Sequence, residues 1–225
     1  MFSLYITGTD TGIGKTLTSC ALLHALRGQG LRAVGMKPVA SGSVWHQDHW
    51  ENEDAQALQA AGMPGVAYAQ INPFALEHPL APELAARDAG IEVTLPPMLS
   101  AYAALAQQAD ALVVEGVGGW EAPLSATMMQ VDLVRALKLP VLLVVGLRLG
   151  CLNHALLSAR AIVADGVHLA GWVGSHVDPE MARVEDNLHM LRARLPAPCW
   201  GVLPHAPNAE PAALAAQLNI PVLTG

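Results

Sequence analysis

A glycine-rich loop near the start of the chain restricts the fold more than any other feature. The loop, Gly8-Thr9-Asp10-Thr11-Gly12-Ile13-Gly14-Lys15-Thr16, follows an apolar run at residues 2–7 and precedes leucines at helical spacing. Its glycines allow successive backbone N–H groups to point at a phosphate, and the next helix adds a partial positive charge at its first turn. The order strand, loop, helix therefore predicts a phosphate-binding loop rather than a plain turn. In such a loop Lys15 contacts the outer phosphates and Thr16 offers its hydroxyl to Mg²⁺.

The spacing within this loop departs from the common pattern. Five residues separate Gly8 from Gly14, where such loops usually have about four. Partition-type ATPases carry an additional lysine five positions before Lys15, and this chain has Asp10 there. That difference argues against their mechanism.

Short apolar runs alternate with longer segments of helical period along the chain. This alternation is typical of a parallel sheet with helices on both faces, and continuous apolar runs indicate strands buried on both sides. We predict an α/β fold of the P-loop NTPase type: a doubly wound, mainly parallel sheet. The expected strands are residues 2–7, 32–37, 111–115, 141–145, 169–175 and 199–202, with a short last strand at 221–223.

Two segments carry an apolar stripe at helical spacing. The first stripe consists of Leu99, Tyr102, Leu105, Ala106 and Ala109, and the second of Leu152, Ala155, Leu156, Ala159, Ile162 and Val163. Residues 41–97 are polar at first and then rich in proline, which predicts short helices and loops outside the sheet. No repeat or linker divides the chain, so we expect a single nucleotide-binding domain over residues 1–225.

The charge balance and the cysteines narrow the class of protein. The chain has 12 Lys and Arg against 19 Asp and Glu, a formal charge of -7, and its basic residues are scattered. Nucleic acid and anionic membranes are therefore not expected as partners. The three cysteines are odd in number and lie far apart, which favours a reducing compartment. Without a leader-like segment, or an apolar run near the roughly 20 residues of a membrane helix, we expect a cytoplasmic protein.

Two acidic residues are candidates for holding a metal ion beside the loop. Glu115 ends the apolar run Leu112-Val113-Val114 and precedes Gly116-Val117-Gly118-Gly119. Since the carboxyl ends of parallel strands meet at the ligand crevice, Glu115 is placed to bind Mg²⁺ directly or through water. A capping role in a tight turn is the alternative. Asp54 lies near a helix start, where the helix dipole favours an acid in any case, so its role stays open.

Lys37 ends the second expected strand, again at the crevice. A lysine there is either a solvated strand end or a second cation that faces transferred phosphate, where it would stabilise developing charge. Ser41 and Ser43 follow a few residues later and could hydrogen-bond a substrate.

Five blocks of sequence, taken in order, carry a resemblance to a known family. They are residues 8–16, Lys37-Pro38-Val39-Ala40-Ser41-Gly42, Asp54, Glu115-Gly116-Val117-Gly118-Gly119 and Leu149-Gly150-Cys151-Leu152-Asn153-His154. In order and spacing they closely resemble the dethiobiotin synthetases of biotin biosynthesis, over essentially the whole chain.

The resemblance implies a ligase that closes the ureido ring of dethiobiotin on 7,8-diaminononanoate, using CO₂, ATP and Mg²⁺. In that family an amine takes up CO₂ as a carbamate, ATP phosphorylates the carbamate to a carbamic-phosphoric anhydride, and the second amine attacks with release of phosphate. Family members are homodimers whose substrate site lies at the subunit interface.

The resemblance also implies a role for each matched residue. Lys37, Lys15 and Thr11 would be catalytic, with Lys37 foremost, and Thr16, Asp54 and Glu115 would hold Mg²⁺. The diamine would contact Thr11, Lys37 and Ser41, and its carboxylate tail would contact Gly150, Cys151, Leu152 and Asn153 of the other subunit. The nucleotide-binding set would be Gly12, Ile13, Gly14, Lys15, Thr16, Leu17, Asp54, Glu115, Gly116, Val117, Gly118, Ser175, His176, Pro204, His205, Ala206 and Glu210.

The chain differs from the family pattern at the nucleotide base. The family has an asparagine after Gly171-Trp172-Val173-Gly174, and this chain has Ser175, whose hydroxyl cannot offer the paired donor and acceptor of an amide. Base selectivity is therefore open, and nucleotides other than ATP could be accepted. Around Glu210 the match is displaced by one position.

Two other functions compete with the ligase. A partition-type or carrier-type ATPase switch would couple hydrolysis to partner binding, but Asp10 and the scattered basic residues disfavour it. A synthetase for corrin-like acids would need a second, glutamine-hydrolysing domain, for which 225 residues leave no room.

Three further features are not assigned a role in the chemistry. The segment Trp45-His46-Gln47-Asp48-His49-Trp50 has few ligands for a metal site. Cys151 is expected to pack near the substrate, since the reaction needs no thiolate. Trp120 would line the active site or lie in the core or an interface.

Overall fold

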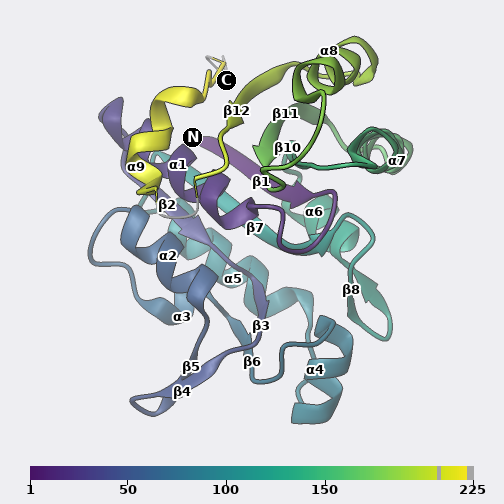
Figure 1. Ribbon diagram of the computed structural model, residues 1–225. Coiled ribbons are helices and arrows are strands. Elements are labelled where there is room, and N and C mark those ends of the chain that lie inside the picture. Colours follow the sequence, from purple (N-terminus) through teal and green to yellow (C-terminus); the bar gives the residue numbers. More distant parts are fainter. Residues whose placement is uncertain (207–208, 222–225) are drawn as a thin grey trace.

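The computed structural model describes residues 1–206 and 209–221. A six-stranded sheet, in the order β12-β11-β10-β1-β7-β2, forms its centre, and each neighbouring pair is parallel (Figure 1). The strands are β1 (Phe2–Gly8), β2 (Ala33–Met36), β7 (Ala111–Gly119), β10 (Val141–Leu147), β11 (Leu169–His176) and β12 (Cys199–Leu203). All six expected strands are confirmed. Of the short last strand expected at 221–223, Pro221 is not in a strand and residues 222–223 lie outside the described residues.

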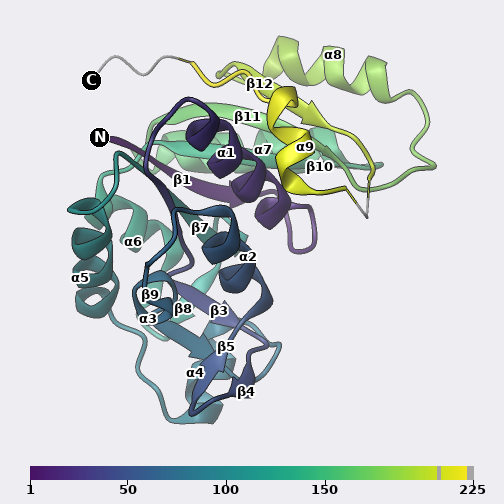
Figure 2. The same ribbon diagram turned by 90° about the vertical axis from the view of Figure 1, so that its left-hand side faces the viewer.

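Helices cover both faces of this sheet, so the doubly wound α/β fold is confirmed (Figure 2). One face packs against α1 (Lys15–Gly28), α2 (Glu53–Ala61), α9 (Pro211–Leu214) and the short η1 (Ala215–Gln217). The other packs against α5 (Leu95–Ala106), α6 (Gln130–Leu137), α7 (Cys151–Ala164) and α8 (Val184–Arg194).

Strand β10 shows why the apolar runs are continuous. All of its residues are buried. Leu142 and Val144 belong to the core under α1, whereas Leu143 and Val145 belong to the core under α6 and α7. Because successive side chains point to opposite faces, a strand with helices on both sides needs an apolar residue at every position.

The proline-rich excursion holds more strands than the sequence predicts. The expected short helices α2, α3 (Tyr68–Ile71) and α4 (Pro82–Ala89) are present. In addition, β3 (Val39–Ser41) pairs with β6 (Phe74–Leu76), and β4 (Val44–His46) forms a hairpin with β5 (His49–Glu51). A further two-stranded pair, β8 (Pro123–Ser125) and β9 (Met128–Met129), follows β7. Strands of three residues are too short to leave a periodic signal.

The hairpin of β4 and β5, residues 44–51, is exposed at the tip of this excursion (Figure 1). Gln47 and Asp48 have φ values of 44° and 71°, the left-handed conformation that a type I′ turn requires. Trp45 and Trp50 pack edge to face with ring centroids 5.3 Å apart. His49 contacts Glu51, with 2.8 Å between Nε2 and Oε1.

The two helical stripes are largely confirmed. Helix α7 buries Ala155, Ala159 and Ile162, but Val163 is 53% exposed because it lies at the edge of the stripe near the helix end. Helix α5 starts earlier than its stripe, with prolines in its first turn, where the missing N–H costs no hydrogen bond. No helix within residues 1–206 and 209–221 has the length and apolar character of a membrane span.

Candidate active site

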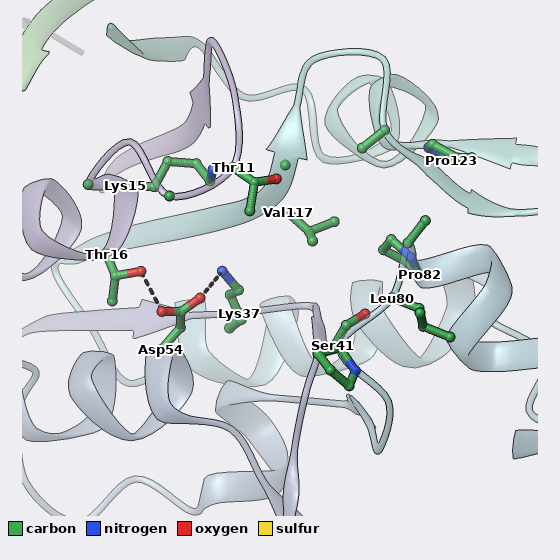
Figure 3. Close-up of a pocket in the computed structure, with 16 residues that line it drawn as sticks. Thr11, Lys15, Thr16, Lys37, Ser41, Asp54, Leu80, Pro82, Val117 and Pro123 are labelled. Atoms are coloured by element: carbon green, nitrogen blue, oxygen red, sulfur yellow. Dashed lines mark hydrogen bonds and ion pairs between the residues drawn. The ribbon is translucent and has the colours of Figure 1, made fainter. Parts of the chain in front are cut away.

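A cleft of about 760 Å³ opens at the carboxyl edge of the sheet, where β1, β2 and β7 end (Figure 3). Residues that the sequence singled out meet there from distant parts of the chain. The cleft is lined by Thr11, Gly12, Gly14, Lys15, Thr16, Lys37, Ser41, Asp54, Pro79, Leu80, Ala81, Pro82, Val117, Gly118, Ala122 and Pro123.

The phosphate-binding loop has the backbone that its glycines permit. Gly12 and Gly14 have φ values of 70° and 84°, in the left-handed region. A Cβ atom on Gly14 would also lie 2.5 Å from Oγ of Ser175, so glycine is required there for two reasons. Lys15 folds back over the loop, and its Nζ donates to the carbonyl oxygen of Asp10 at 2.9 Å. Burial and the nearby charge of Lys37 lower the pKa of Lys15 to about 8.

Three oxygen-bearing side chains converge beside the loop. Oγ1 of Thr16 lies 2.7 Å from Oδ1 of Asp54 and 2.8 Å from Oε1 of Glu115. Asp54 stands in the first turn of α2, where the Asn52 side chain accepts a hydrogen bond from its N–H. Glu115 is fully buried, and its Oε2 has no hydrogen-bond partner among the described residues. Hydroxyl and carboxylate oxygens with an unused buried lone pair fit Mg²⁺, which prefers oxygen ligands.

Lys37 bridges the two carboxylates. Its Nζ lies 2.6 Å from Oε1 of Glu115 and 2.8 Å from Oδ2 of Asp54, and it donates to the carbonyl oxygen of Gly116 at 3.2 Å. Burial disfavours the ammonium, yet the charges of Glu115 and Asp54 outweigh it and raise the pKa of Lys37. The lysine is therefore a buried cation aimed into the cleft, and a solvated strand end is excluded for it.

The main chain of Lys37 is fixed by α3 and its C-cap. Its N–H donates to the carbonyl oxygen of Ile71 at 2.7 Å, and the Asn72 amide donates to its carbonyl oxygen at 2.7 Å. The excursion thus holds the lysine at the end of β2.

Ser41 and Thr11 lie on the same cleft (Figure 3). Oγ of Ser41 is buried and has no partner within the described part of the chain, which leaves it available to a ligand. Oγ of Ser43 is likewise buried and unpartnered there, but Ser43 does not line the cleft.

The expected base-binding residues lie on the other side of β1 in the sheet order, at the ends of β11 and β12. Ser175 and Leu203 are partners in neighbouring strands, which brings His176 and His205 together. Nδ1 of His205 lies 3.2 Å from the carbonyl oxygen of His176. Pro204 and Ala206 flank His205, whereas Glu210 is exposed just before α9.

The block at the start of α7 does not reach this cleft within one chain. Gly150 caps the helix with φ 96°, Cys151 is buried, and Leu152 and Asn153 follow; none of the four lines the cleft. Leu149, the residue before them, is 95% exposed.

Sequence reasoning missed several residues of the site. Arg148 forms an ion pair with Asp10 and so joins the end of β10 to the phosphate loop; a charged residue after an apolar strand was the signal. The wall Pro79–Leu80–Ala81–Pro82 left no pattern beyond its prolines. Trp120, one candidate for lining the site, is buried in the core, and its Nε1 donates to Oδ2 of Asp165 at 2.7 Å.

Comparison with known proteins shows what this chain is similar to. A family model described as an AAA domain (AAA_26) matches residues 3–213. A protein of Xanthomonas oryzae pv. oryzae (strain PXO99A), named ATP-dependent dethiobiotin synthetase BioD, is 62% identical over 219 residues, covering 97% of this chain and 98% of the relative. One of the same name from Xylella fastidiosa (strain 9a5c) is 61% identical over 218 residues, covering 96% of each.

A solved structure supports the fold alone. The MinC:MinD cell division protein complex of Aquifex aeolicus matches with a TM-score of 0.54 and 13% identity, covering 92% of this chain and 83% of that one.

Proposed function

Because this chain belongs to the family of ATP-dependent dethiobiotin synthetases, we propose that it forms the ureido ring of dethiobiotin from 7,8-diaminononanoate, CO₂ and ATP. The observation that carries the proposal is the cleft itself: the phosphate loop, the buried Lys37 and the carboxylate of Asp54 line one cavity, and Lys37 also contacts the buried Glu115. Such a cavity suits phosphoryl transfer to a small acceptor, in which positioning and charge stabilisation do most of the catalysis.

The proposed reaction has three steps. One amine of the substrate adds to CO₂ and loses a proton, which gives a carbamate. A carbamate oxygen attacks the γ-phosphorus of ATP, the bond to the β,γ-bridging oxygen breaks, and ADP leaves. The second amine then attacks the carbonyl carbon of this carbamic-phosphoric anhydride and gives up a proton to solvent, and phosphate leaves with the former carbamate oxygen as the ring closes.

Lys37 and Lys15 would stabilise the charge on the transferred phosphoryl group. Both ammonium groups border the cleft, and a preorganised cation aimed at developing charge lowers the barrier without reorganisation. Thr11 and the unpartnered hydroxyl of Ser41 would position the diamine end of the substrate. Main-chain N–H groups of Gly12, Ile13, Gly14 and Leu17 would bind phosphate oxygens.

Mg²⁺ would be held by Thr16, Asp54 and Glu115, whose oxygens already converge. Bound there, the ion supplies charge neutralisation of the nucleotide phosphates. Ser175, His176 and residues 204–206 would form the side of the site that receives the base, with Glu210 near it.

We also propose that the chain acts as a homodimer with one domain per subunit. The family resemblance implies that residues 150–153 contact the substrate carboxylate in the site of the other subunit. In support, none of them lines the cleft of its own chain, and the preceding Leu149 is exposed. Backbone N–H groups at the start of α7 can bind a carboxylate without a formal cation.

The test is phosphate release by the purified protein with Mg-ATP and bicarbonate, with and without 7,8-diaminononanoate, followed by mass spectrometry of the product. We expect phosphate and dethiobiotin in equal amounts, both dependent on the diamine. Hydrolysis that ignores the diamine and yields no dethiobiotin would refute the ligase and favour an ATPase switch.

A further inference from the structure

The strongest unassigned feature of the site is a glutamine behind its wall. Gln130 begins α6, and its side chain is completely buried although it is polar. It does not line the cleft, and nothing in the sequence pattern distinguishes it from other polar residues at a helix start. Within the described residues, however, its side chain bonds Val117, which lines the cleft, Gly119 beside it, and Thr7, which precedes the phosphate loop.

The amide of Gln130 holds the main chain that follows Glu115. Its Oε1 accepts a hydrogen bond from the N–H of Val117 at 2.8 Å, and its Nε2 donates to the carbonyl oxygen of Gly119 at 2.9 Å. A Cβ atom on Gly116 would lie 2.4 Å from Oε1 of Gln130, so the amide packs directly against this segment. One planar side chain therefore fixes both ends of residues 117–119.

Two further bonds tie this segment to its neighbours. Nε2 of Gln130 lies 3.3 Å from Oγ1 of Thr7, the residue before the phosphate loop. The main-chain N–H of Gln130 donates to the carbonyl oxygen of Ala122 at 2.9 Å. Ala122, like Val117 and Gly118, lines the cleft.

Val117 and Gly118, in the segment that Gln130 holds, line the part of the cleft where the diamine would bind. In Figure 3, Val117 and Pro123 stand on one side of the cavity, and Ser41 and Leu80 stand on the other. Lys37 also donates to the carbonyl oxygen of Gly116, so the same segment touches the buried lysine. A buried amide with both groups paired is rigid, because leaving either group unpaired costs free energy.

We infer that Gln130 is a positioning residue that sets the wall of the cleft at Val117, Gly118 and Ala122 for the diamine substrate. The inference rests on the proposed function. Gln130 is not among the residues that line the cleft; it acts through the main chain of Val117 and Gly119. Since displacement of a substrate by about 1 Å can cost on the order of 100-fold in rate, loss of the brace is a catalytic defect and not only a loss of stability.

The experiment replaces Gln130→Met, which keeps the length of the side chain and removes both hydrogen-bonding groups. Val134→Ala is the matched control, because Val134 is a fully buried residue of the same helix whose side chain makes no hydrogen bond to the wall. Steady-state rates, nucleotide affinity and melting temperature are measured for each. Gln130→Asn, shorter by one bond of about 1.5 Å, is used if the methionine variant does not fold.

For Gln130→Met we expect kcat/KM for the diamine to fall by about tenfold or more, with a higher KM for the diamine. The affinity for Mg-ATP, which the phosphate loop determines, stays within about twofold. Val134→Ala lowers the melting temperature and leaves kcat/KM for the diamine within about threefold. Unchanged kinetics in the Gln130 variant that folds, or an equal kinetic loss in Val134→Ala, would overturn the inference.

Hydrogen exchange separates this inference from the proposed function. In Gln130→Met, amides of residues 116–122 should exchange faster than in the wild-type protein, whereas those of α7 should not. If the wild-type protein makes no dethiobiotin, the proposed function is refuted, but the exchange comparison still tests the role of Gln130. Equal exchange in Gln130→Met and the wild-type protein would show that Gln130 does not hold residues 116–122 in place.

Discussion

At the scale of single residues, Lys37 is the side chain on which the proposed phosphoryl transfer depends most. Its ammonium is held between Glu115 and Asp54 at the end of β2. We expect Lys37→Ala to lower kcat by about 100-fold or more, with Mg-ATP affinity within about threefold, since the phosphate loop remains. Phosphate release and a fluorescent nucleotide titration measure the two quantities. Lys138→Ala, at an exposed lysine after α6, is the control; unchanged turnover in Lys37→Ala would remove the lysine from the mechanism.

Ser175 sets a second test at this scale. Its hydroxyl lies against Gly14, where a Cβ atom would be 2.5 Å from Oγ, and Ser175 belongs to the proposed base-binding set. An asparagine at this position would offer an amide to the base. We expect Ser175→Asn to raise the ratio of kcat/KM for ATP to that for CTP by about fivefold, the worth of one hydrogen bond. Ser175→Ala should leave the ratio where it is. Equal ratios in all three proteins would show that the base is recognised elsewhere.

How far residues are predictable from sequence depends on whether they act through their own side chain. Lys15 stands out through the glycine-rich loop that contains it. Lys37 and Glu115 stand out because a charge at the end of an apolar run needs a reason. Asp54 was ambiguous, since its helix start explains an acid equally well. Gln130 and Leu80 were missed: one acts through another segment's main chain, and the other is an ordinary apolar residue brought to the cleft by folding.

At the scale of elements, the central strands were predictable because burial on both faces demands continuous apolar runs. The short strands β3 to β6 were not, since each relies on a partner rather than on its own pattern. Strand β7 was predicted to end at Glu115 but continues to Gly119, because hydrogen bonds of Gln130 and pairing with Gly8 extend it.

The far edge of the sheet yields a stability prediction. Arg32 precedes β2 and Asp110 precedes β7. They form a bidentate ion pair, with 3.0 Å between Nε and Oδ2 and 2.8 Å between Nη2 and Oδ1. The hydrogen bonds from Arg32 lower the pKa of Asp110 from 3.8 to about 2. A depressed pKa means that the stabilisation is complete above the ordinary value and is lost as pH falls toward about 2.

We therefore expect Asp110→Asn to lower the midpoint of urea unfolding at pH 7. The difference from the wild-type midpoint should shrink as the pH is lowered from 3.8 toward about 2. The shift is small, because the pair is exposed. Activity should not change, since the pair lies opposite the cleft. Asp88→Asn, at the more distant pair with Arg87 (3.7 Å), is the control; a difference for Asp110→Asn that persists undiminished at low pH would contradict the assignment.

At the scale of the whole molecule, the proposed dimer can be tested by complementation. A site that takes Lys37 from one subunit and Asn153 from the other is broken in both pure variants, Lys37→Ala and Asn153→Ala. Mixed dimers restore one intact site each, so random reassembly should recover about a quarter of wild-type turnover. The assay mixes the unfolded variants, refolds them together and compares them with each variant refolded alone. Recovery no greater than the average of the two would place both residues in one subunit's site.

The exposed hairpin gives the molecule a built-in optical signal. Trp120, Trp172 and Trp200 are buried, whereas Trp45 is 56% exposed and packs on Trp50. A collisional quencher such as iodide therefore reaches the fluorescence of the hairpin and not that of the core. Because Ser41 on the cleft lies three residues before Val44, where the hairpin starts, a change in quenchable emission when ligand is added would show that binding alters the hairpin.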